Sequence, residues 1–140
     1  MTMALLMVTP VVVATGWLLV RLVGDPGGSN PLLELVLGSQ DPLALFLLGL
    51  TAVVLAPLFE ETIFRGALLP VLAKRWGTAG GVVLSALLFA MAHISIGELA
   101  PLTVLGIGLA LVRVSTGRLL PSVLMHALWN AITFLNLLVL

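Results

Sequence analysis

Long runs of hydrophobic residues alternate with short polar stretches along the whole chain. An α-helix of about 20 apolar residues crosses the hydrocarbon core of a bilayer, which is about 30 Å thick. Segments of that length and character lie at approximately 4–23, 43–73, 78–96, 97–114 and 119–139. The pattern therefore predicts an all-α, polytopic transmembrane helix bundle of about five spans, organised as one membrane domain over residues 1–140.

Two local patterns predict where helices begin. Asp41 followed by Pro42 combines a preferred N-cap residue with a preferred first helical residue. Ser95 with Glu98 three positions later has the spacing of a capping box ahead of the fourth segment. The second segment either accommodates its prolines, such as Pro57, or breaks at one of them, and the sequence leaves both alternatives open.

The composition supports a membrane protein and excludes several kinds of function. Hydrophobic residues make up 61% of the chain and charged residues 9%, and the mean hydropathy is +1.27. A soluble domain averages roughly 25% charged residues. Six basic and six acidic residues cancel, so the chain has no basic field to bind nucleic acid. The absence of cysteine excludes disulfides, thiolate metal sites and a cysteine nucleophile.

Basic residues predict the orientation in the membrane. Lys74, Arg75, Arg113 and Arg118 fall in two loops on one side, and the opposite side is mainly acidic. Basic loops face the cytoplasm, so we expect the N-terminus inside and the C-terminus outside. The short chain suggests a bacterial plasma membrane. The first apolar segment lacks the basic start of a signal peptide and is interpreted as a retained helix.

A few polar side chains fall inside the predicted spans, where a charge costs at least ~2.5–3.5 kcal/mol and indicates function. They are Glu60, Glu61, Arg65, His93, His126 and Asn130. Glu61 and Arg65 are four residues apart in the favourable order, which predicts an ion pair within one helix. Glu60 points in another direction on the same helix, so it needs a different partner.

The remaining polar residues combine into two alternative sites. Phe89 and His93 share one helix face, and His126 and Asn130 share another. A carboxylate and a histidine can hold and deprotonate a water, while a histidine and an amide can stabilise an oxyanion. Alternatively, Glu60, His93 and His126 are a plausible three-ligand set for a divalent metal such as zinc. These residues alone do not separate the two sites.

The common intramembrane protease designs lack their key residues here. The sequence has no HExxH, no Gly-x-Ser-Gly and no aspartate within a predicted span. Three other motifs are present in order: "EETIFR" matches EExxxR, "FAMAH" matches FxxxH and "HALWN" matches HxxxN. With these motifs, a core of approximately residues 43–140 resembles the CAAX prenyl endopeptidase and bacteriocin-processing (CPBP, Abi) family of intramembrane proteases.

The resemblance implies a glutamate-dependent endopeptidase with an assigned role for each motif. Glu60 and His93 would activate the water, and His126 with Asn130 would form the oxyanion hole. Support would come from three further residues of the same motifs, namely Glu61, Arg65 and Phe89. The family is labelled a metalloprotease, although a water held by Glu and His needs no metal.

Two other functions are compatible with the same residues. One is a non-catalytic membrane protein of this fold, such as a bacteriocin-immunity or scaffold protein. The other is a proton-coupled transporter, although internal repeats, which are frequent in transporters, are absent from the sequence. For the enzyme, the expected partners are a peptide or membrane-protein substrate and the lipid bilayer, and the oligomeric state stays open.

Overall fold

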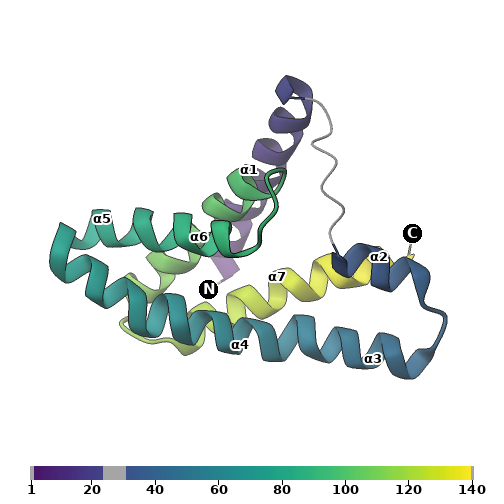
Figure 1. Ribbon diagram of the computed structural model, residues 1–140. Coiled ribbons are helices and arrows are strands. Elements are labelled where there is room, and N and C mark those ends of the chain that lie inside the picture. Colours follow the sequence, from purple (N-terminus) through teal and green to yellow (C-terminus); the bar gives the residue numbers. More distant parts are fainter. Residues whose placement is uncertain (1, 24–30, 140) are drawn as a thin grey trace.

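The computed structural model describes residues 2–23 and 31–139, and residues 1, 24–30 and 140 lie outside the description. Every element in those two ranges is helical, which confirms the predicted all-α class. In chain order the elements are α1 (Thr2–Val23), α2 (Pro31–Gly38), α3 (Pro42–Leu50), η1 (Thr51–Leu55), α4 (Ala56–Glu61), η2 (Thr62–Leu68), α5 (Leu69–Ala92), α6 (Leu99–Thr116) and α7 (Leu120–Val139). Figure 1 shows α7 running beside the stretch that contains α3 and α4, and α6 packing against α5.

Within residues 2–23 and 31–139, three helical stretches are long and apolar enough to cross a membrane, so the chain is an integral membrane protein. They are Pro42–Ala92, Leu99–Thr116 and Leu120–Val139, and α1 contributes a shorter apolar part, Thr9–Leu22. The first stretch has 51 residues, far more than the 20 or so that one span requires. It contains the second segment expected from the hydropathy pattern and most of the third, whose expected end at residue 96 was wrong because the helix ends at Ala92.

A sharp turn divides this long stretch into two arms. Trp76 and Gly77 leave the helical conformation, and Gly77 has φ 74°, which a residue without a Cβ adopts at little cost. After the turn the chain runs back along itself (Figure 1). A Cβ on Gly81 would lie 2.7 Å from the backbone nitrogen of Ala73, so the two arms touch through their backbones. The result is a helical hairpin with the exposed Lys74 next to its tip.

The helix does not break at its prolines, which decides between the two alternatives left by the sequence. Two π-helical stretches, η1 and η2, each end two residues before a proline, Pro57 and Pro70 respectively. In each case the residue before the proline donates its N–H to the carbonyl five positions back: Ala56 to Thr51, and Leu69 to Phe64. The wider turn accommodates the ring of each proline, so the helix continues past Glu60.

Helix α6 occupies the middle of the bundle. Its Gly106 packs against Ala86 of α5, where a Cβ on the glycine would come within 3.1 Å of the Ala86 Cα. Its Ala110 packs with Leu69 and Val82 of α5. On another face α6 joins a second apolar cluster with α1 and α7: Val12, Leu105, Leu109, Val112 and Met125. Small residues thus bring the helices close, as is usual in membrane bundles.

The two helix-start predictions had opposite outcomes. Asp41 is the N-cap of α3, its side chain accepts from the Leu43 N–H at 3.0 Å, and the cap is confirmed. The capping box was wrong: α6 begins at Leu99 with Glu98 as the N-cap residue, and the Glu98 side chain makes no capping hydrogen bond within the described structure. Ser95 lies in a non-helical turn that follows α5, so it is not placed to cap α6.

Candidate active site

The ion pair expected between Glu61 and Arg65 is present at the centre of the bundle. Arg65 Nη1 donates to Glu61 Oε1 at 2.9 Å, and both side chains are fully buried. Arg65 Nη2 donates to the carbonyl of Gly106 at 3.0 Å, and the guanidinium lies 4.4 Å from the Phe89 ring centroid. Arg65 therefore links the α4–η2 helix to both α5 and α6.

Glu61 has two further partners, both on α7. Ser122 donates its hydroxyl to Glu61 Oε2, and His126 Nδ1 lies 3.1 Å from Glu61 Oε1. Sequence reasoning missed Ser122, because serines in membrane helices usually bond their own backbone. The available signal was its spacing: Ser122 precedes His126 by four residues and shares its helix face. Glu61 is thus held by three side chains and has a structural position.

His126 lies between the two neighbouring glutamates. Its Nδ1 faces Glu61 Oε1, and its Nε2 lies 3.7 Å from Glu60 Oε2. An ionised carboxylate only accepts hydrogen bonds, so the contact with Glu61 assigns the proton to Nδ1. In the neutral imidazole Nε2 is then an acceptor that faces another acceptor. A donor between these two atoms, such as a water, satisfies both.

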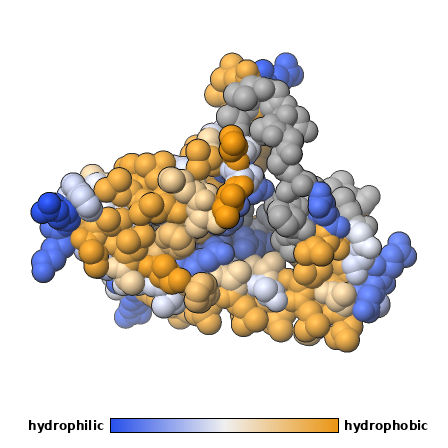
Figure 2. Space-filling view, viewed as in Figure 1, coloured by the Kyte–Doolittle hydropathy of each residue, from blue (hydrophilic) through white to orange (hydrophobic). Residues whose placement is uncertain are grey.

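Glu60 differs from Glu61 in its surroundings. Its side chain is 26% exposed, while its Oε2 is buried and has no hydrogen-bond partner within the described part of the chain. Figure 2 shows a hydrophilic area recessed between the apolar surfaces of the bundle. A carboxylate that is unpaired by any arginine and open on one side is available to a water or a substrate.

His93 is the C-cap residue of α5 and lies four residues after Phe89. Its Nδ1 is 2.9 Å from the Phe89 carbonyl oxygen, and its ring contacts the Phe89 ring edge-to-face with centroids 4.8 Å apart. The His126 ring contacts the same Phe89 ring at 5.5 Å. Among the described residues, the ion pair within 4.0 Å of Glu60 comes from His126 and not from His93. Phe89 therefore holds both histidines, and only one of them lies next to Glu60.

Asn130 makes a hydrogen bond to the backbone of the neighbouring helix. Its Nδ2 donates to the carbonyl of Ala52 in η1 at 2.8 Å. The residue is partly buried, one turn beyond His126 on α7. One of the two hydrogens on the amide that the motif predicts as an oxyanion donor is therefore donated to the backbone of the neighbouring helix.

The geometry does not fit the three-ligand metal set. Among the described residues, no three carboxylate or imidazole groups come together closely enough to hold a metal ion. In the described chain His93 makes no ion pair within 4.0 Å of Glu60, and both nitrogens of His126 face carboxylates. A zinc site made of Glu60, His93 and His126 would need a different arrangement of these helices.

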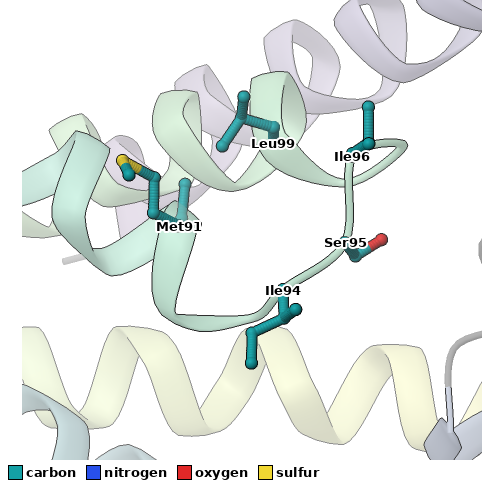
Figure 3. Close-up of a pocket in the computed structure, with 6 residues that line it drawn as sticks. Met91, Ile94, Ser95, Ile96 and Leu99 are labelled. Atoms are coloured by element: carbon teal, nitrogen blue, oxygen red, sulfur yellow. The ribbon is translucent and has the colours of Figure 1, made fainter.

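An apolar turn follows His93 and encloses a recess. The recess has a volume of about 310 Å³ and is lined by Ala90, Met91, Ile94, Ser95, Ile96 and Leu99 (Figure 3). Ile94 has φ 52°, a left-handed conformation that is uncommon for a β-branched residue. The side chains of Ile94 and Ile96 are 93% and 84% exposed, respectively, so the turn presents apolar surface beside His93.

Comparison with known proteins identifies the family. The sequence matches the family described as type II CAAX prenyl endopeptidase Rce1-like over residues 42–132, which contain all three motifs. An uncharacterised 24.3 kDa protein of Escherichia coli is 40% identical over 82 residues, which cover 55% of this chain and 38% of that relative. The match therefore spans less than half of the relative's length. No solved structure matches the chain significantly. The chain belongs to the type II CAAX prenyl endopeptidase Rce1-like family of membrane proteins.

Proposed function

We propose that this chain is an intramembrane endopeptidase in which Glu60 deprotonates the water that attacks a peptide bond. Family membership supports a CAAX protease-type peptidase in general. The observation that carries the specific proposal is the contrast between the two glutamates. Glu61 is held by Arg65, Ser122 and His126. Glu60 has a buried Oε2 without a hydrogen-bond partner in the described chain, 3.7 Å from His126 Nε2.

The gap between Glu60 and His126 suits a water that donates one hydrogen to each. Two acceptors 3.7 Å apart both fall within hydrogen-bond distance, about 2.8 Å, of one oxygen. Such a water directs its lone pairs away from the two acceptors, toward the exposed side of Glu60. A substrate carbonyl placed on that side would meet a nucleophile that is already oriented.

The proposed reaction has two steps. Glu60 takes a proton from the water while the water oxygen bonds to the carbonyl carbon, and the carbonyl π electrons move onto oxygen. The tetrahedral intermediate then collapses, the C–N bond breaks, and the leaving nitrogen takes the proton from Glu60. Ser122, Glu61 and Arg65 do not exchange protons in this scheme. They keep His126 in the tautomer that presents Nε2 to the water.

The family resemblance gives His93 a share in activating the water, but this proposal gives that share to His126, because both hydrogens of the water are donated to Glu60 and His126. The Nδ1 of His93 faces a carbonyl and so carries the proton, which makes Nε2 an acceptor. Its exposed position next to the apolar turn supports a role in contact with an approaching substrate. We assign no step to a metal, because Glu60, His93 and His126 do not converge as a ligand set.

The proposed substrate is a peptide or a segment of a membrane protein that enters from the bilayer. We propose a bacterial plasma membrane, with the N-terminus cytoplasmic and the C-terminus outside. The exposed Lys74, Arg75 and Arg118 support this orientation, since basic loops face the cytoplasm.

The test compares the membrane peptides of cells that produce the parent or Glu60→Gln, measured by quantitative mass spectrometry. Glu34→Gln is the matched control, because Glu34 is an exposed glutamate on α2. Peptides cleaved in the parent and in Glu34→Gln should fall by several decades in Glu60→Gln, while all three proteins accumulate equally. Equal cleavage by the Glu60→Gln protein would overturn the proposal. Absence of cleavage in every strain would favour a non-catalytic member of the family, an alternative supported by the lack of an ion pair between His93 and Glu60 among the described residues.

A further inference from the structure

Asn130 makes a contact that neither the motif nor the reaction explains. Its side-chain amide crosses from α7 to η1 and donates to the Ala52 carbonyl at 2.8 Å. A main-chain carbonyl inside a helix normally accepts from the helix itself. The Ala52 carbonyl is therefore free to accept from a side chain only if its own helix does not supply a donor.

The local sequence explains why that carbonyl lacks a helical partner. In an α-helix it would accept from the N–H four residues later, on Ala56, but Ala56 donates to Thr51 instead. In a π-helix it would accept from the N–H five residues later, which is Pro57 and has none. Both backbone donors are thus lost at the same carbonyl. In a hydrocarbon environment, an unsatisfied carbonyl is costly and needs a donor from elsewhere.

We propose that Asn130 is a positioning residue whose amide satisfies the carbonyl left by Pro57, and so fixes α7 in register against the helix that carries Glu60. His126 and Asn130 lie on one face of α7. One contacts Glu60 and Glu61, and the other contacts η1 on the N-terminal side of them. Two contacts one turn apart define the axial position of α7. A slip of α7 would carry His126 Nε2 away from Glu60.

This inference concerns the assembly of the proposed site, and its structural part does not depend on catalysis. It also differs from an oxyanion role. An oxyanion donor would act on the substrate and would be indifferent to Pro57. A positioning residue should become dispensable once the Ala52 carbonyl has another donor.

Pro57→Ala supplies that donor. Whether the helix keeps its π turn or becomes α-helical, Ala52 can then accept from the backbone, at position 57 or at position 56. The experiment is a double-mutant cycle of Asn130→Leu and Pro57→Ala. Pro70→Ala is the matched control, because Pro70 also follows a π-helical stretch but lies away from Asn130. Thermal unfolding is measured in detergent.

A distance measurement gives the second readout. The chain has no cysteine, so spin labels can be attached at two introduced sites, the exposed Val54 on η1 and Ile132 on α7. Asn130→Leu should lower the unfolding midpoint by several degrees and broaden the distance between the labels. Adding Pro57→Ala should return the unfolding midpoint and the label distance most of the way to their parent values. Adding Pro70→Ala should return neither.

Additive effects of Asn130→Leu and Pro57→Ala would overturn the inference. So would an unchanged distance together with lost peptide cleavage, since that result identifies an oxyanion donor. If the Asn130→Leu protein does not accumulate, Asn130→Asp runs the same cycle, because it keeps the size and removes the amide donor. If the parent cleaves no peptide, the proposed function is refuted. The spin-label distances in the double-mutant cycle would still decide the role of Asn130.

Discussion

Glu61→Gln is the change that best separates the two neighbouring glutamates. Glutamine keeps the shape of the side chain and removes its charge. Arg65 would then be a fully buried cation whose remaining partners are the Gly106 carbonyl and the face of Phe89. The carboxylate that accepts from Ser122 and His126 would be lost at the same time.

The expected loss of stability is large compared with the total free energy of unfolding. At a separation of 2.9 Å and an effective dielectric constant of ~20, the gross attraction between Arg65 and Glu61 is ~6 kcal/mol. Removing one partner of a buried pair costs ~3–5 kcal/mol net. The free energy of unfolding of a domain is about 5–15 kcal/mol. The ratio of folded to unfolded protein should thus fall by a factor of about 10²–10⁴, since ~1.4 kcal/mol is tenfold.

Thermal unfolding in detergent, followed by the fluorescence of the three tryptophans, measures this loss. We expect Glu61→Gln to lower the midpoint by roughly 10–20 °C. The neighbouring Glu60→Gln is the matched control and should change it by only a few degrees, because Glu60 is partly exposed and has no arginine partner. Combining Glu61→Gln with Arg65→Met should recover much of the stability, since no buried charge remains unpaired.

The reverse pattern would refute this reasoning. If Glu61→Gln is as stable as the parent but inactive, while Glu60→Gln is unstable, the structural and catalytic roles belong to the other glutamate in each case.

Three further outcomes follow from the same structure. Ser122→Ala removes a buried hydrogen bond to the charged Glu61, so the free energy of unfolding measured by chemical denaturation should fall by ~1.5–3 kcal/mol. Gly81→Ala should cost ~1–3 kcal/mol in the same measurement, because its Cβ would lie 2.7 Å from the Ala73 nitrogen. Gly66→Ala, whose Cβ would meet nothing closer than 3.7 Å, is the control and should be neutral or stabilising. The parent should still cleave peptides after dialysis against a chelator, because no three ligating groups converge among the described residues. If the chelator abolishes cleavage and added zinc restores it, the enzyme uses a metal site that requires a different arrangement of the helices.

Features that depend on neighbouring residues in the chain were predicted well. The apolar segments identified the membrane helices, and the Asp41–Pro42 pair identified the start of α3. The four-residue spacing of Glu61 and Arg65 identified their ion pair. Each of these is a property of a single helix, for which length, hydropathy and periodicity suffice.

Features that depend on tertiary packing were not predicted. Nothing in the sequence shows that His126, rather than His93, lies beside Glu60, because this depends on how α7 docks against α4. The π-helical turns were also missed, since a proline inside an apolar run is compatible with a break or a continuous helix. The capping-box pattern at Ser95 failed because the chain turns there, with Ile94 at positive φ, before α6 begins.

The partners of Glu61 become available at very different times during synthesis. Arg65 follows it by four residues, so the pair can form as soon as this helical turn leaves the ribosome, and it can enter the bilayer as a neutral unit. Ser122 and His126 follow by 61 and 65 residues, which corresponds to about 3–13 s of translation at ~5–20 residues per second. Until α7 has been synthesised, the His126 imidazole is not beside Glu60. A nascent chain can therefore insert Glu61 already paired with Arg65 before the proposed catalytic pair exists, and the docking of α7 is the event that brings Glu60 and His126 together.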